Sequence, residues 1–421
     1  MAFLYPFLNF LQPGVLFPVL APYRPMLVIS VLAGLIGIRA LMQNDNTDPR
    51  RGFLAHPAFI WLCLFMAVQV LSVYYSGVRN MLEELDFWVV YPMFAAVSLL
   101  IVRDAADLRR YVWGMMLGSA VVVGFGLYAV AAHLSTLAGG RAGAYGMYEN
   151  HNDYTFLIVQ VLPFAYFYLG LTRRILPRLF LLALLVGCVC GVVLSLSRGG
   201  AMALVLECGM ILWLQTSGTR RVAALAVFAV LGGAVVVYQF AAREANQGAT
   251  YSEEQAKQER FELWRAARSA YLSNPILGVG SRRFAEFSQR YGELGHDDLG
   301  KVAHNTYLEL AADSGTLGLG TFLLMLRGVF RSLRGARVVR ASDDGLAQTQ
   351  LAAWVSLWSI LFRAFLDAKE YDWSFYTLTV IAIVSSTLLA RRAPQEAPLA
   401  AAAAAAGAAP APVRPMIYGR R

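Results

Sequence analysis

Charged side chains are scarce in this sequence. They make up 15% of the 421 residues, against 58% hydrophobic residues, whereas soluble domains carry about 25% charged residues. This shortage excludes an ordinary soluble protein. The chain also lacks a basic segment before its first apolar stretch, so we expect that stretch to be a membrane span and not a cleaved signal peptide.

Cysteine is also rare. Cys63, Cys188, Cys190 and Cys208 all fall inside apolar stretches, without the spacing of a metal site. None lies in a polar segment where a disulfide could form. We therefore expect the cysteines to be small packing residues.

Long apolar runs are abundant. A helix needs roughly 20 mostly apolar residues to cross the bilayer core. Twelve segments qualify, at about 3–20, 26–42, 58–75, 87–102, 111–132, 154–171, 177–196, 200–216, 222–240, 306–326, 347–366 and 373–390. The sequence therefore predicts an all-α polytopic membrane protein with about twelve transmembrane helices.

The net charge of +9 is unevenly distributed among the loops. Alternate loops hold most of the arginines: Arg39, Arg50, Arg51, Arg103, Arg109, Arg110, Arg173, Arg174, Arg178, Arg220, Arg221, Arg327, Arg331, Arg334, Arg337 and Arg340. By the positive-inside rule these loops and both termini face the cytoplasm. The positive charge thus indicates how the chain is oriented in the membrane, and we predict no nucleic-acid partner.

The domain prediction divides the chain in two. Residues 1–393 form the transmembrane domain, and residues 394–421 form a disordered, Ala- and Pro-rich cytoplasmic tail. Between spans nine and ten, residues 241–305 form a large outward loop, periplasmic in a Gram-negative cell. A helix is expected there from Glu253 to Leu272, ended by Asn274-Pro275.

His304 and Asn305 stand where this loop re-enters an apolar helix. The exposed N–H groups of a helix N-terminus favour anions and disfavour imidazolium. A neutral His304 there can accept a proton as a general base, and Asn305 can orient the ring or a substrate hydroxyl. The alternative is an interfacial histidine bonded to a backbone carbonyl.

Arg198 lies between two apolar spans and precedes Gly199 and Gly200. Its guanidinium can bind phosphate with two hydrogen bonds, and the glycines permit the close approach of a ligand or backbone. The alternative is an arginine that extends to the membrane interface.

Other polar residues carry weaker signals. Glu207 lies deep in a span and is either functional or paired with an arginine. His296-Asp297-Asp298 could hold a divalent cation, but no further ligand set surrounds it, and we predict no metal or cofactor. An outward cluster is expected to form an ion-pair network: Arg363, Asp367, Lys369, Glu370 and Asp372.

Three motifs in order resemble the O-antigen ligase/polymerase superfamily. They are Ser195-Leu196-Ser197-Arg198-Gly199, then Arg260-Phe261-Glu262-Leu263-Trp264 with Asn274-Pro275-Ile276-Leu277-Gly278-Val279-Gly280, and His304-Asn305 with Gly315 and Gly318. The resemblance covers roughly residues 190–325 by motif. It implies a metal-independent C-type membrane glycosyltransferase of the bacterial inner membrane, acting on an undecaprenyl-pyrophosphate-linked glycan at the periplasmic face.

The resemblance also implies roles for Arg198, for His304 and for an arginine of the loop helix. Either Arg260 or Arg265 fits the last role. A sugar diphosphate needs its charge compensated as the bond breaks, which arginines can do. We expect catalytic His304, Arg198 and Arg260, with Arg265, Asn305 and Trp264 binding substrate.

The leading interpretation is an O-antigen ligase with lipid A–core as acceptor and inverting chemistry. A polymerase or a protein O-oligosaccharyltransferase of the same superfamily shares the donor. A secondary transporter is a different class with twelve spans, but it would favour two similar halves and polar residues near the bilayer midplane.

Overall fold

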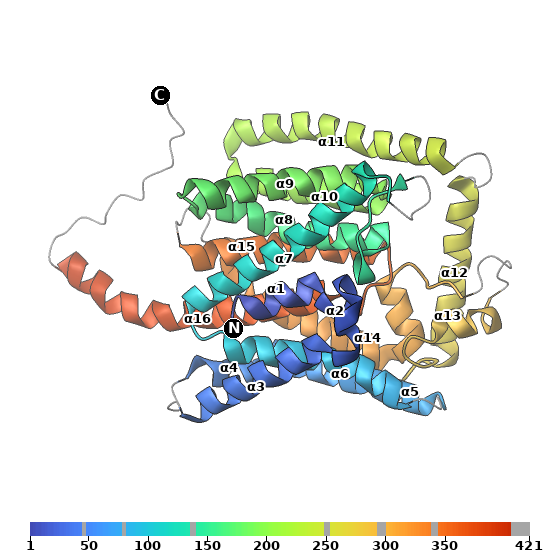
Figure 1. Cartoon of the computed structure of the whole chain (residues 1–421), viewed down its shortest axis with the longest axis horizontal. Helices are drawn as coiled ribbons and strands as arrows, with labels where there is room; N and C mark the ends of the chain where they lie inside the picture. The colour runs from blue at the N-terminus through green and yellow to red at the C-terminus, as the bar shows by residue number, and fades with distance from the viewer. Residues whose placement is uncertain are drawn as a thin grey trace.

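The computed structural model describes residues 1–43, 48–77, 81–134, 140–247, 253–292, 300–337 and 344–405, and these ranges are helical with no strand. Long helices lie side by side, and α12 (Glu253–Ser273) stands across one end of the bundle (Figure 1). The long helices are α3 (Pro25–Gln43), α5 (Pro57–Tyr75), α6 (Met81–Ile101), α7 (Ala105–Ala131), α8 (His151–Leu171), α9 (Ile175–Ser195), α10 (Arg198–Gln215), α11 (Gly218–Gln247), α14 (Thr306–Ser332), α15 (Gly345–Ala364) and α16 (Trp373–Ala405).

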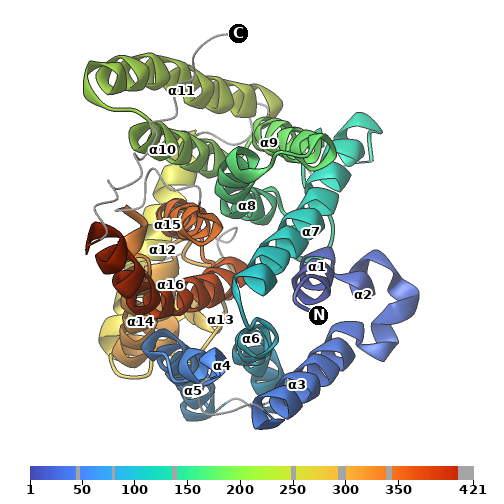
Figure 2. The same cartoon turned by 90° about the vertical axis from the view of Figure 1, so that its left-hand side faces the viewer.

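Eight of the described helices are long and apolar enough to cross a membrane: α3, α5, α6, α7, α8, α9, α11 and α16. They confirm a multi-pass, all-helical membrane protein. Viewed from the end opposite α12, α8 lies inside the bundle, whereas α3 and α11 lie at its edges (Figure 2). Accordingly α8 is the most buried of the eight and α11 the least.

The first predicted span, residues 3–20, is not one helix. It consists of α1 (Leu4–Leu11), α2 (Pro13–Leu16) and the start of the 3-10 helix η1 (Pro18–Tyr23). The break occurs at Gln12, which adopts a left-handed conformation with φ of 50° before a proline that cannot continue the ladder. An eight-residue helix is about 12 Å long and cannot cross the bilayer core by itself.

The C-terminal helix continues past the predicted start of the disordered tail at residue 394. Helix α16 ends at Ala405, and residues 406–421 lie outside the described ranges. Alanine has the highest helix propensity of all residues, so an Ala-rich sequence can extend a helix that the bundle already supports.

Helix α14 is kinked at Gly315, whose φ of 64° and ψ of −161° are not helical. The turn after α12 packs into this kink. A Cβ on Gly315 would lie 2.4 Å from the carbonyl of Ile276, and one on Gly278 would lie 2.3 Å from the carbonyl of Asp313. The glycines are therefore required for the close approach of two backbones.

The segment between α11 and α14 has its own small core. Ala266, Ala267 and Ala270 of α12 pack on Phe284 of α13 (Phe284–Phe287) and on Ala312 of α14. The side chain of Asp313 accepts hydrogen bonds from three backbone N–H groups, of Arg282, Arg283 and Phe284. These contacts fix α12 against the start of α14, where His304 lies.

Candidate active site

His304 lies one residue before the N-cap of α14, and the helix begins at Thr306, where the predicted segment 306–326 begins. The φ of 50° at His304 is left-handed. Asn305 is the N-cap, and its Oδ1 accepts hydrogen bonds from the N–H groups of Tyr307 at 3.0 Å and Leu308 at 3.1 Å. The His304 side chain keeps 31% of its surface exposed.

The residues on both sides of His304 are held by two other parts of the chain. Trp264 of α12 donates its indole N–H to the carbonyl of Ala303 at 2.9 Å. The backbone N–H and the hydroxyl of Thr306 both donate to the carbonyl of Asp367, at 3.0 and 2.8 Å. The indole N–H of Trp264 thus positions the loop that holds His304. The sequence predicts a substrate contact for Trp264, whereas its polar group bonds to the backbone.

The His304 ring faces a buried carboxylate. Its Nδ1 lies 3.4 Å from Oδ1 of Asp367, in the connection between α15 and α16. Burial alone would raise the pKa of Asp367, but Lys369, the His304 hydrogen bond and Arg363 outweigh it and hold this pKa well below its usual range. An ionised carboxylate only accepts, so the proton of a neutral imidazole resides on Nδ1 and Nε2 keeps its lone pair.

Asp367 belongs to the predicted ion-pair network. Lys369 lies 3.6 Å and Arg363 3.9 Å from its Oδ2, and Lys369 also pairs with Asp153 of α8. Two further acids are buried beside it: burial raises the pKa of Glu370 to about 7 and that of Asp372 to about 6. The sequence indicated this network, but its contact with His304 was missed.

Arg363 connects the network to the start of α10. It is 1% exposed, and its Nη2 donates to the carbonyl of Asn152 at 3.1 Å. A Cβ on Gly199 would lie 2.2 Å from Arg363 Nη1, and one on Gly200 would lie 2.8 Å from the Cβ of Thr155. Both glycines therefore permit a close approach, as the sequence predicts. The groups that approach them are the side chains of Arg363 and Thr155.

Two arginines lie together next to this junction. Arg198, half-buried, holds its guanidinium 4.8 Å from the ring centre of Phe240. Arg141 is buried and donates from Nε to the carbonyl of Ser195 at 3.0 Å. Burial, and then the charge of Arg198, lower the pKa of Arg141. Two like charges held close together favour an anion between them.

The loop-helix arginines differ in placement. Arg260 is half-buried, and its charge acts on Arg363. Arg265 is exposed and lies beside the buried alanine face of α12, not on it. The geometry therefore brings Arg260, and not Arg265, toward the network that contains His304.

Glu207 stays apart from these residues. It is 0% exposed, and neither carboxylate oxygen has a hydrogen-bond partner in the described part of the chain. Among the described residues Glu207 forms no ion pair with an arginine. The His296-Asp297-Asp298 motif lies outside the described residues.

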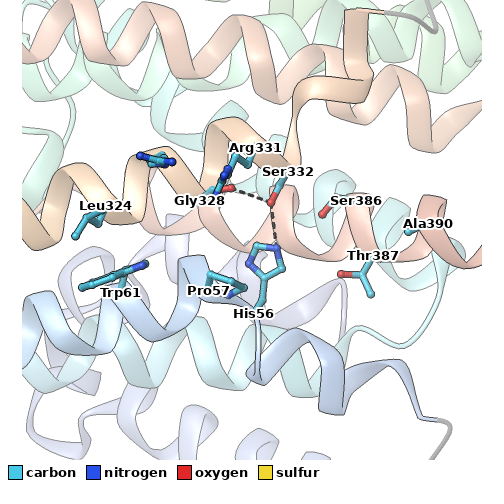
Figure 3. A pocket seen from close by; sticks show the side chains of 11 residues that line it. His56, Pro57, Trp61, Leu324, Gly328, Arg331, Ser332, Ser386, Thr387 and Ala390 are labelled. Atoms are coloured by element: carbon cyan, nitrogen blue, oxygen red, sulfur yellow. Dashed lines mark hydrogen bonds between the residues drawn. The ribbon is translucent and has the colours of Figure 1, made fainter.

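The bundle also contains a pocket of about 610 Å³ between α5, α14 and α16 (Figure 3). His56 there caps α5, because its Nδ1 accepts from the N–H of Ala58 at 3.1 Å, and its Nε2 lies 3.2 Å from Ser332 Oγ. None of the predicted site residues lines this pocket.

Apolar helices packed around a buried ion-pair network define a multi-pass membrane protein with a polar centre at one end. Residues 180–323, about a third of the chain, match the family model described as O-antigen ligase. This match supports the assignment to the O-antigen ligase family that the motifs predicted, and it indicates a membrane glycosyltransferase-like enzyme. The comparison with curated proteins found no match. The matched segment includes Arg198, α12 and His304 but ends before Asp367.

Proposed function

We propose that this protein is an O-antigen ligase. It transfers a polymeric glycan from undecaprenyl pyrophosphate to a sugar hydroxyl of lipid A–core in lipopolysaccharide assembly, by an inverting and metal-independent reaction. The observation that carries the proposal is the half-exposed His304 backed by Asp367, at the end of the bundle where Arg141, Arg198 and Arg260 gather.

His304 acts as the general base in this proposal. Asp367 accepts a hydrogen bond from the Nδ1–H group and orients the ring, and Nε2 takes the proton of the acceptor hydroxyl. The hydroxyl oxygen forms a bond to the anomeric carbon as the bond from that carbon to the phosphate oxygen breaks. A single displacement of this kind inverts the anomeric centre.

The arginines bind the leaving group. Undecaprenyl pyrophosphate departs with the bonding electrons, and its negative charge grows in the transition state. Fixed guanidinium groups aimed at that charge stabilise the transition state without reorganisation. Arg198 and Arg260 hold the diphosphate, with Arg141 beside Arg198. Asn305 and Trp264 keep the His304 loop in place through its cap and through Ala303.

The proposal includes an orientation in the bacterial inner membrane. The site faces the periplasm, both termini are cytoplasmic, and α10, α14, α15 and the broken segment 3–20 complete twelve crossings. The arginine-rich loops support this orientation, because such loops remain cytoplasmic. Labelling of single cysteines placed at the exposed position 217, between α10 and α11, and in the 140–150 segment by a membrane-impermeant reagent tests it. Labelling of position 217 from outside intact spheroplasts would contradict it.

The function is tested by glycan transfer with the purified protein. Undecaprenyl-pyrophosphate-linked glycan and lipid A–core are supplied in the presence of EDTA, and the acceptor is analysed for a shift to a glycosylated band. A shift that persists with EDTA supports a metal-independent ligase. Longer lipid-linked glycan with an unmodified acceptor would mean a polymerase. Uptake of a solute into vesicles, without either product, would mean a transporter.

A further inference from the structure

A second polar cavity lies at the end of the bundle opposite His304. It has a volume of about 860 Å³ and is formed by the starts of α7, α9 and α15, the end of α8, and Arg392 of α16. The length of helix α15 measures the distance between this cavity and the His304 network. Gly345, at the start of α15, lines the cavity, and Arg363, near its end, pairs with Asp367 of the network. At 1.5 Å per residue these two positions are about 27 Å apart. We call this cavity the α7–α9–α15 pocket.

The α7–α9–α15 pocket carries an excess of positive charge. Four arginines line it, Arg109, Arg173, Arg174 and Arg392, and the one carboxylate in its lining is Asp344. Asp344 is already compensated, because Arg392 Nη1 lies 3.2 and 3.3 Å from its two oxygens. The other three arginines form no ion pair with a described residue. The pocket therefore has guanidinium groups available for a phosphate.

The start of α9 adds to this preference for an anion. Arg174 is the N-cap residue of this 21-residue helix, and its side chain makes no capping hydrogen bond. The first backbone N–H groups of a helix have no partner within it, so here they lack a side-chain acceptor as well. Such N–H groups bind phosphate oxygens, and they lie beside the three available arginines.

The remaining wall is suited to a lipid. Trp113 and Tyr168 line the pocket with their rings 6.2 Å apart, and the Tyr168 hydroxyl bonds to Thr349 at 2.8 Å. Next to it, α9 exposes Leu176 by 75% and Leu179 by 51%. Aromatic rings of this kind sit at the level of lipid headgroups, and exposed leucines face acyl chains. The site thus combines a phosphate-binding rim with an apolar flank.

We propose that the α7–α9–α15 pocket binds the phosphodiester of an anionic phospholipid, whose acyl chains lie along α9. Basic pockets between transmembrane helices bind such headgroups. The apolar flank favours a lipid over free phosphate. The distance from His304 separates this lipid from the reacting glycan, so the inference holds whether or not the protein is a ligase.

The test is lipid retention by the delipidated full-length protein, measured by native mass spectrometry with phosphatidylglycerol or phosphatidylcholine. The expected result is that phosphatidylglycerol binds at least tenfold more tightly. The triple variant Arg109→Gln, Arg173→Gln, Arg174→Gln is expected to lose this preference. These side chains are exposed and form no ion pair among described residues, so the variant is expected to fold.

A matched control separates a site from general surface charge. Arg39→Gln, Arg51→Gln and Arg220→Gln remove the same charge from exposed residues of α3, of the short helix 49–54 and of α11, none of which lines the pocket. Equal loss of binding in this control would overturn the proposal, as would equal retention of phosphatidylcholine by the unmodified protein. A third arm uses inorganic phosphate as competitor. Displacement of the lipid by millimolar phosphate would assign the pocket to the free ion and overturn the lipid assignment.

Discussion

His304 Nδ1 lies 3.4 Å from Asp367 Oδ1, although 63 residues separate the two in the sequence. The backbone fixes this distance, because Thr306 donates both its N–H and its hydroxyl to the carbonyl of Asp367, and Lys369 N–H donates back to the Thr306 hydroxyl. The start of α14 and the connection between α15 and α16 thus form one hydrogen-bonded unit. A carboxylate held in this way can orient the imidazole without moving during the reaction.

This pairing predicts non-additive losses of activity. Asp367→Asn keeps the shape of the side chain but offers an amide to Nδ1, so we expect kcat to fall about 10²–10⁴-fold, the usual contribution of acid–base catalysis. His304→Ala is expected to lose a similar factor. If Asp367 acts only through His304, replacing it has no further effect once His304 is gone. The double variant is therefore expected to be no slower than His304→Ala.

The measurement is single-turnover glycan transfer by the three variants and the unmodified protein. Asn305→Asp is the control for loop structure, because aspartate is an equally good N-cap residue. It is expected to retain most of the activity if Asn305 serves mainly as the cap of α14. Multiplying losses in the double variant would show that His304 and Asp367 act independently and would contradict the dyad.

The two arginines of α12 offer a matched comparison. Arg260→Gln removes a half-buried charge near Arg363, and we expect kcat to fall about 10²–10³-fold, as for loss of one transition-state donor. Arg265→Gln removes an exposed charge from the same helix and is expected to change kcat by less than about fivefold. Both variants are assayed at saturating donor. The reverse order would assign the phosphate contact to Arg265.

The sequence predicted the helices well because apolar run length determines where a membrane helix begins and ends. The predicted segment 154–171 corresponds to α8 at His151–Leu171, and 373–390 lies within α16. Four predicted spans are not among the eight described helices that are long and apolar enough to cross a membrane: 200–216, 306–326 and 347–366, which correspond to α10, α14 and α15, and 3–20, where the apolar composition concealed the break at Gln12-Pro13. Hydropathy averages over a window and therefore cannot detect a single residue that leaves the helical conformation.

The site was only partly predictable, for a different reason. His304 and Arg198 stand out locally, because each is a polar residue at an apolar boundary, and Arg260 stands out through the motif that it forms with Trp264. Asp367 could be assigned only to a charge cluster, since its contact with His304 depends on tertiary packing. One sequence feature of Arg141 indicates a functional role: it is an arginine in an outward loop, where basic residues are few. Its proximity to Arg198 depends on how α7, α9 and α10 pack.

Gly199 provides a test of the junction between α10 and Arg363. In Gly199→Ala the new Cβ would lie 2.2 Å from Arg363 Nη1, so the guanidinium or the helix has to move. Overpacking of this kind costs about 1–3 kcal/mol. We expect a lower thermal unfolding midpoint together with reduced transfer activity. Gly233→Ala in α11 is the control, because no atom lies within 4 Å of its added Cβ. Equal behaviour of the two variants would contradict the close packing.

His56 predicts a pH dependence of stability that is separate from catalysis. Burial lowers its pKa below the ordinary value of 6.5, and the neutral ring is needed because Nδ1 accepts the capping N–H of Ala58. The unfolded chain therefore binds a proton at a higher pH than the folded chain does. Stability from His56 is complete above pH 6.5 and is lost as the pH falls toward the lowered folded pKa.

Thermal unfolding midpoints measured between pH 5 and 8 check this prediction. Asparagine caps helices without titrating, so His56→Asn is expected to keep the cap and to flatten the fall in midpoint below pH 6.5. His133→Asn changes an exposed histidine and is expected to leave the profile as in the unmodified protein. If the His56→Asn profile instead fell as steeply on acidification, the loss would arise from other groups. The buried acids Glu370 and Asp372 would not explain such a fall. Their pKa values are raised in the folded chain, so these two groups increase the free energy of unfolding as the pH decreases.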